Sequence, residues 1–301
     1  GGSDIATYYL SYGRVNEDGM VPEDKDTHTR NTVSLRGTIG QDKLKVSGSI
    51  NYSNKSISAI AAGQGGDGAT LFQELIQIPR DKSIVDFSDY NSQWNNLGNF
   101  YTPYAFNPYW VLNEDGATFD EDRVYGNTSV SYSPIEWLNF TYRVGLDAAN
   151  SGQKQWVAVA TIPEGTPNFG VQSDLPGAVI EGTALARELD QTLMASVNLN
   201  INSSLSLSTL VGLNANERYT LSKRIKVTDL TLPGFYNVAN TSATPSVSTD
   251  ETKRRLVGVY GQAELGYKDY LFLTVLARND WSSTLPANSN SFFYLQFCSK
   301  L

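Results

Sequence analysis

The chain has few of the residues that metal and redox chemistry require. Its 301 residues include one histidine, one cysteine and two methionines. Because histidine and cysteine are the usual ligands of zinc, haem iron and iron–sulfur clusters, we expect no metal centre and no such cofactor. Cys298 has no second cysteine with which to form an internal disulfide. His28 has no serine or cysteine partner at a recognisable spacing, so we expect no catalytic nucleophile activated by it.

Long apolar runs and an excess of basic residues are also missing. No run approaches the ~20 apolar residues of a membrane-spanning helix, which excludes a helical membrane protein. The net charge of −8 argues against nucleic-acid binding, which needs a basic face. No basic start followed by an apolar core opens the chain. We therefore expect either a cytoplasmic chain or one whose natural N-terminus lies upstream.

Aromatic residues and alternating apolar positions are abundant instead. The chain has 17 tyrosines, 12 phenylalanines and 5 tryptophans, which strands favour. In residues 138 to 146 every second residue is apolar, as in a strand whose two faces differ. The same period predicts nine strands, with a tenth beginning at residue 291. The nine lie near residues 5–15, 29–39, 44–58, 122–133, 137–149, 184–201, 205–224, 254–267 and 270–279.

The connections between these strands alternate between short and long. Short ones occupy residues 40–43, 133–136, 202–204 and 268–269, and long ones occupy 16–28, 59–121, 150–183, 225–252 and 279–290. An outer-membrane barrel has short turns on its inner side and long loops on its outer side, whereas a soluble sandwich mixes lengths at both ends. Aromatic residues beside the short turns are typical of an interfacial girdle; they are Tyr132, Trp137, Tyr267 and Tyr270. We therefore predict an all-β fold, an antiparallel transmembrane β-barrel segment.

Several long segments resemble SusC-like (RagA-like) TonB-dependent outer-membrane transporters, the nutrient importers of the Bacteroidetes. They are "YYLSYGRVNEDGMVP" (8–22), "NPYWVLNE" (107–114), "DRVYGNTSVSYSPIEWLNFTYRVGLD" (122–147) and "RRLVGVYGQAELGYKDYLFLTVLARNDWSSTLP" (254–286). The resemblance implies a barrel of about 22 strands around an N-terminal plug domain. It also implies an outer-membrane location, a capping SusD-like surface lipoprotein, and import of glycans or peptides with energy from TonB, ExbB and ExbD. No plug motif is present in these residues.

The resemblance also predicts how the chain divides. Residues 1–294 are expected to form a partial barrel domain that is inactive alone. The likeness stops at Leu295, so residues 295–301, "LQFCSKL", are expected to be an atypical tail produced by a frameshift or a misassembled reading frame.

The segment from residue 59 to residue 121 is the main candidate for binding. Aromatic rings can stack on sugar rings or peptide side chains, and we predict six contacts with substrate or partner: Trp94, Tyr101, Tyr104, Phe106, Tyr109 and Trp110. The alternative is that these rings form the loop's own small core. Residues 70–80, "TLFQELIQIPR", are expected to form a short helix that holds the loop down.

Basic residues flank another long connection. Lys223, Arg224 and Lys226 precede it, and Lys253, Arg254 and Arg255 follow it. These six cations are candidates for contact with lipopolysaccharide phosphates. A solvated rim is the alternative.

Two other classes of function remain open. One is a secreted β-rich carbohydrate-binding module, which would need a closed apolar core. The other is a glycoside hydrolase, which would need two carboxyl groups at a defined separation across a cleft. The motifs favour transport over catalysis.

Overall fold

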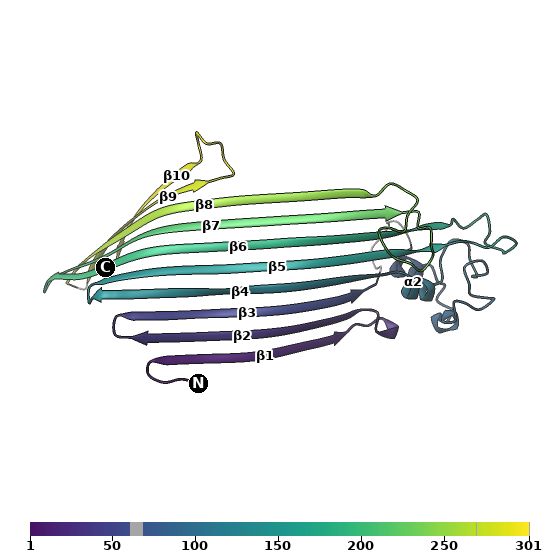
Figure 1. Cartoon of the computed structure of the whole chain (residues 1–301), viewed down its shortest axis with the longest axis horizontal. Coiled ribbons are helices and arrows are strands. Elements are labelled where there is room, and N and C mark those ends of the chain that lie inside the picture. The colour runs from purple at the N-terminus through teal and green to yellow at the C-terminus, as the bar shows by residue number, and fades with distance from the viewer. Residues whose placement is uncertain (61–68, 269, 301) are drawn as a thin grey trace.

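The structure, a computed structural model, describes residues 1–60, 69–268 and 270–300. Within them ten strands form one antiparallel sheet, and each strand pairs with the next along the chain (Figure 1). The strands are β1 (Ala6–Asp18), β2 (Thr27–Gln41), β3 (Leu44–Ala59), β4 (Gly116–Ile135), β5 (Leu138–Ala160), β6 (Leu175–Asn202), β7 (Leu205–Thr228), β8 (Ser246–Tyr267), β9 (Leu271–Ser282) and β10 (Ser291–Lys300). The helices are η1 (Pro22–Asp24), α1 (Leu71–Ile76), η2 (Ile84–Phe87) and α2 (Pro108–Glu114). The predicted all-β fold and its antiparallel strands are confirmed.

The loops are sorted by length as predicted. Figure 1 shows the hairpin turns at residues 42–43, 136–137 and 203–204 at one end of the sheet, and the helices and the long loops between β1 and β8 at the other. Asp42 and Lys268 adopt positive φ angles of 47° and 49°, which a tight turn demands and which aspartate tolerates better than most residues.

Most strands extend further toward the long loops than the sequence predicted. β6 has 28 residues, although crossing a bilayer takes only ~9 to 11. Residues 246–252, predicted as loop, belong to β8, and the loop predicted over 59–121 ends where β4 begins at Gly116. The paired strands continue beyond the residues with alternating apolar side chains. Backbone hydrogen bonds between strands do not depend on apolar side chains.

The register gives the sheet two chemically different faces. Leu213 pairs with Leu193, which pairs with Tyr142, and residues in register share one face. We call this the apolar face, and it also carries Tyr132 and Tyr267 of the predicted girdle. The polar face carries the alternate residues of each strand. No helix among the described residues is long and apolar enough to span a membrane.

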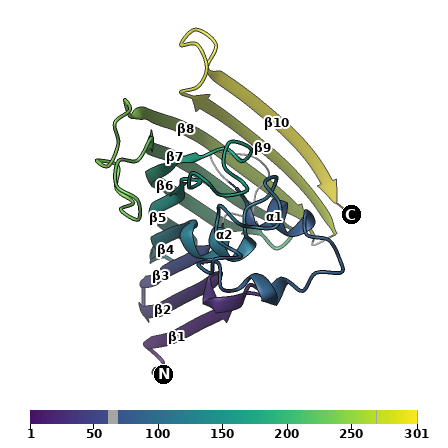
Figure 2. The same ribbon diagram turned by 90° about the vertical axis from the view of Figure 1, so that its right-hand side faces the viewer.

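The sheet curves, and α1 and α2 lie on its concave side at the end where the long loops gather (Figure 2). The buried apolar side chains of the described residues all lie in long loops or at the adjoining strand ends. In the middle of the sheet, side chains on the apolar face such as Leu193 and Leu213 are about half exposed. A single layer without a core of its own fits a barrel wall and does not fit a sandwich.

Residues 295–300 continue β10 in register with β9, from Leu295 opposite Ala277 to Lys300 opposite Phe272. Cys298 is exposed on this strand. The predicted origin of the tail in a frameshift stays a prediction, and Leu301 lies outside the described residues.

Candidate functional site

The segment between β3 and β4 contains two short helices fixed by buried polar side chains. At the start of α2, Asn107 is fully buried, and its Oδ1 accepts a 2.9 Å hydrogen bond from the backbone N–H of Tyr109. Its Nδ2 donates to the carbonyl oxygens of Phe87 and Asn95, at 2.9 and 3.1 Å. With Pro108 at the first helical position, Asn107 caps α2 and also ties the helix to the η2 region.

The predicted helix in residues 70–80 is confirmed as α1. It begins after Thr70, whose side chain accepts a hydrogen bond from the backbone N–H of Gln73. Glu74 in this helix is 2 % exposed, and its carboxylate accepts a 2.6 Å hydrogen bond from the backbone N–H of Phe106. Burial raises the pKa of Glu74, because the charged form loses its hydration. The carboxyl group thus links α1 to the aromatic segment before α2.

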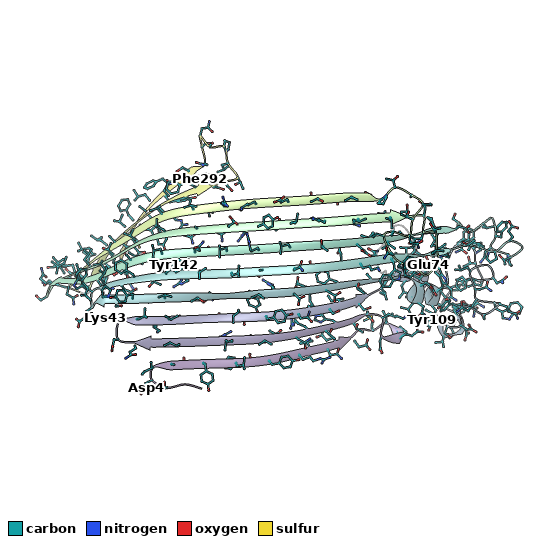
Figure 3. All side chains as sticks on the ribbon, in the orientation of Figure 1. Asp4, Lys43, Glu74, Tyr109, Tyr142 and Phe292 are labelled. Atoms are coloured by element: carbon teal, nitrogen blue, oxygen red, sulfur yellow. The ribbon has the colours of Figure 1, made fainter. Side chains whose placement is uncertain are left out.

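Five of the six aromatic residues predicted as contacts fall into two groups (Figure 3 labels Tyr109 and Glu74). Trp110 is buried and stacks on Phe106 with ring centroids 5.5 Å apart, and Tyr109 packs beside it between two buried clusters. Trp94 and Tyr104 are 73 % and 79 % exposed. The first three rings stabilise the loop, while the last two face solvent.

Tyr101 is intermediate between these two groups. Its ring stacks on Phe87 with centroids 5.6 Å apart, and its hydroxyl donates to the carbonyl oxygen of Gln77 at 3.2 Å. Its side chain is nevertheless 43 % exposed. Tyr101 is therefore held in place by Phe87 and Gln77 while part of its ring remains exposed.

Two neighbouring loops are fastened to this segment. From residues 161–174, Asn168 donates to the carbonyl oxygens of Leu97 and Phe100, at 3.0 and 3.1 Å. From residues 229–245, the hydroxyl of Tyr236 donates to the carbonyl oxygen of Glu114 at 3.2 Å. The three loops therefore form one joined surface at the outer end of the sheet, which we call the loop cap (residues 69–115, 161–174 and 229–245).

A buried carboxyl group lies where the loop cap meets the sheet. Asp115 is 4 % exposed, and its Oδ1 accepts a 2.7 Å hydrogen bond from the backbone N–H of Ala158 in β5. Its Oδ2 has no hydrogen-bond partner. Burial raises the pKa of Asp115 to about 7, with a smaller contribution from the charge of Glu114. Burial, with help from nearby carboxylates, likewise raises the pKa of Tyr236 to about 12.

The polar face carries charged and amide side chains that bond to one another. Arg123 makes two hydrogen bonds with the carboxylate of Asp147, one of them 2.8 Å long. Asn214 and Asn216 both donate to the carboxylate of Asp190. Among the described residues no group of three or more histidine, cysteine or acidic side chains could hold a metal ion. This face suits contact with water or with a polar interior.

Sequence reasoning missed α2 and the burial of Asp115. The pair Asn107–Pro108 is a recognisable start of a helix and could have revealed α2. Nothing in the sequence near Asp115 indicates its burial, because its hydrogen-bond partner, Ala158 in β5, is distant in sequence.

The single curved sheet and its loops define a segment of a β-barrel wall, and comparisons with known proteins agree. No family model matches the chain. It is 24 % identical to the TonB-dependent receptor P26 of Formosa agariphila, over 98 % of this chain and 28 % of that protein. A structure of the RagAB peptide transporter covers 99 % of this chain and 33 % of its own, with a TM-score of 0.76 and 18 % identity. The RagAB peptide importer in its "open-open" state gives a TM-score of 0.74 and 19 % identity, with 99 % of this chain and 32 % of that chain covered.

These likenesses confirm the resemblance to SusC-like TonB-dependent transporters that the sequence motifs indicated. The structural likeness establishes the fold, and the predicted outer-membrane location agrees with it. The chain spans about a third or less of the length of these proteins.

Proposed function

We propose that the chain forms part of the barrel wall of a TonB-dependent transporter that imports glycan or peptide nutrients across the outer membrane. The observation that carries this proposal is the single curved sheet, with one apolar face and with the long loops between β1 and β8 gathered at one end. A wall of this kind separates lipid from a polar interior. Its function is transport rather than catalysis, and no cofactor is needed.

In this proposal a SusD-like surface lipoprotein covers the loop cap. TonB, ExbB and ExbD act through a plug region that lies outside these residues. The RagAB structures are described as those of a peptide transporter, which makes peptides the first substrates to test.

Among the six predicted rings, contact with substrate or lipoprotein falls to those that remain exposed. Trp94, Tyr104 and the exposed edge of Tyr101 offer apolar faces at a surface rich in amides and carboxylates. Phe106, Tyr109 and Trp110 contribute by holding that surface in place.

The proposal is tested in cells that make the full-length protein carrying this chain. We expect the protein in the outer-membrane fraction, and we expect uptake of fluorescent peptides or oligosaccharides that stops when TonB is deleted. A protein found in the cytoplasm, or uptake that continues without TonB, would show the proposal to be wrong.

Replacing Trp94 and Tyr104 together by alanine tests the contact surface. We expect at least about tenfold weaker substrate uptake or lipoprotein binding, since exposed aromatic anchors dominate many interfaces. The matched control is Phe72→Ala, which removes a ring on α1 that is 65 % exposed and lies outside the predicted set, and it should change neither.

A further inference from the structure

A cluster of cations on the apolar face surrounds one carboxylate. Glu217 in β7 accepts from Nε of Arg255 at 2.6 Å and pairs with Nζ of Lys253 and Nη2 of Arg187, both at 3.3 Å. The three cations come from β6 and β8, on either side of β7. We call Arg187, Glu217, Lys253 and Arg255 the cation cluster, and its net charge is about +2 when all four groups are ionised.

The register places the whole cluster on the apolar face. Glu217 pairs with Leu189 and Arg255, and in the next row Tyr219 pairs with Arg187 and Lys253. Since the paired residues of a row share a face, all of these side chains lie on the same face as Leu213 and Leu193. Of the six cations that the sequence suggested, Lys223, Lys253 and Arg255 lie on the apolar face. Arg224, Lys226 and Arg254 lie on the polar face.

The cluster lies at the border of the apolar band. From Leu205 at the short turn to Ala215, the alternate residues of β7 on this face are Leu205, Leu207, Thr209, Val211, Leu213 and Ala215. Ten residues at ~3.3 Å each, tilted by ~40°, rise ~25 Å, which is the height of the apolar band of an outer-membrane barrel. Glu217 is the next residue on that face, so the cluster sits at headgroup level on the side of the long loops.

The cations are only partly neutralised and stay accessible. The side chains of Arg187, Lys253 and Arg255 are 49 %, 45 % and 60 % exposed, whereas that of Glu217 is 21 % exposed. The guanidinium carbon of Arg187 also lies 5.8 Å from the centroid of the Tyr219 ring, which fixes its orientation. Further along the same face lie Glu251, paired with Leu221, and Lys223, paired with Thr249, whose opposite charges leave the net positive charge of this region unchanged.

We propose that the cation cluster binds the phosphate groups of an outer-leaflet glycolipid of the lipid A type, whose acyl chains lie along the apolar face below it. Guanidinium and ammonium groups donate several charge-assisted hydrogen bonds to phosphate oxygens. One carboxylate shared by three cations holds them together before the lipid arrives. The proposal rests on the outer-membrane placement in the proposed function and adds the site and its ligand.

The test uses the full-length protein in detergent micelles, with native mass spectrometry to measure bound lipid. The probes are diphosphoryl lipid A and the same lipid with its phosphates removed. We expect the phosphorylated lipid to bind more tightly, and we expect replacement of Arg187, Lys253 and Arg255 by glutamine to weaken its binding about a hundredfold. The matched control removes three positive charges from the polar face (Arg143, Arg218 and Arg254, each to glutamine) and should leave lipid binding unchanged.

A second variant separates ligand binding from folding. Glu217→Gln removes the anion that competes with phosphate, so we expect equal or tighter binding of the phosphorylated lipid. The proposed lipid site would be wrong if the two lipids bound equally tightly, or if the triple variant and its control lost the same amount of lipid binding. Either result would leave the proposed transport function untouched. Failure of the protein to enter micelles as a folded barrel would overturn both this site and the proposed function.

Discussion

The carboxyl group of Asp115 and the backbone N–H of Ala158 are joined by a 2.7 Å hydrogen bond that fixes the end of α2 to β5. The other carboxyl oxygen of Asp115 is buried and has no hydrogen-bond partner. A protonated carboxyl group tolerates that burial better than a carboxylate does, which is why its pKa rises to about 7.

We therefore predict that attachment of the loop cap weakens as the pH rises. Between the ordinary carboxyl pKa near 3.8 and about 7, the folded state holds more protons than the unfolded state, so stability falls across that range and is constant above it. The loss is on the order of 2–4 kcal/mol, and Asp115→Asn should abolish it because the amide cannot ionise.

Limited proteolysis of residues 69–115 at pH 5 and pH 8 would measure this effect, with each rate taken relative to the Asp115→Asn variant at the same pH. Asp89→Asn, at an exposed aspartate of the same loop, is the control and should follow the wild type. A ratio that is the same at both pH values would show that Asp115 does not couple protonation to the loop cap.

Asn107→Ala should destabilise the loop cap by about 2–4 kcal/mol. The change removes the helix cap of α2 and leaves the carbonyl oxygens of Phe87 and Asn95 without their donor. Hydrogen exchange of α2 amides should accelerate accordingly, while exchange in the middle of β5 should not change. Gln93→Ala, at an exposed position of the same loop, should have no effect, and comparable acceleration there would contradict the assignment.

The strands and the sorting of the loops could be predicted because both depend on local patterns. The alternation in residues 138–146 specifies one strand without reference to any other part of the chain. Strand ends could not be predicted in the same way. Residues 246–252 have no apolar alternation and become strand only because β7 offers backbone partners to them.

The division of the loop aromatics into buried and exposed rings could not be predicted either. Trp94 and Trp110 occur in similar surroundings of asparagine and tyrosine. Trp110 is buried because α2 turns it toward Leu71 and Ala158, residues brought together by the fold of three separate segments. The cation cluster was missed in part for the same reason, because Arg187 is distant in sequence from Arg255.

This division predicts that two similar substitutions destabilise the loop cap to very different extents. Trp110→Ala should cost about 3–5 kcal/mol of loop-cap stability, because it opens a cavity against Phe106. Trp94→Ala should cost less than about 0.5 kcal/mol, because its ring is exposed. Hydrogen exchange of residues 69–115 would compare the two, and equal destabilisation would contradict the placement of Trp94 at the surface.

Charged substitutions on the two faces of the sheet test which face meets lipid. Leu193 lies in the middle of the apolar face, between Tyr142 and Leu213. If this face meets lipid, Leu193→Arg places a charge in the apolar band and should destabilise the folded barrel by about 2–4 kcal/mol. Asn127→Arg is the matched control, because Asn127 is exposed on the polar face, where Arg143 already lies at a similar height. Urea unfolding of the full-length protein in lipid vesicles would measure both. If Asn127→Arg lowered the free energy of unfolding more than Leu193→Arg did, the polar face and not the apolar face would be the one that meets lipid. A charge is costly on a surface that faces lipid, whereas a polar interior accommodates it.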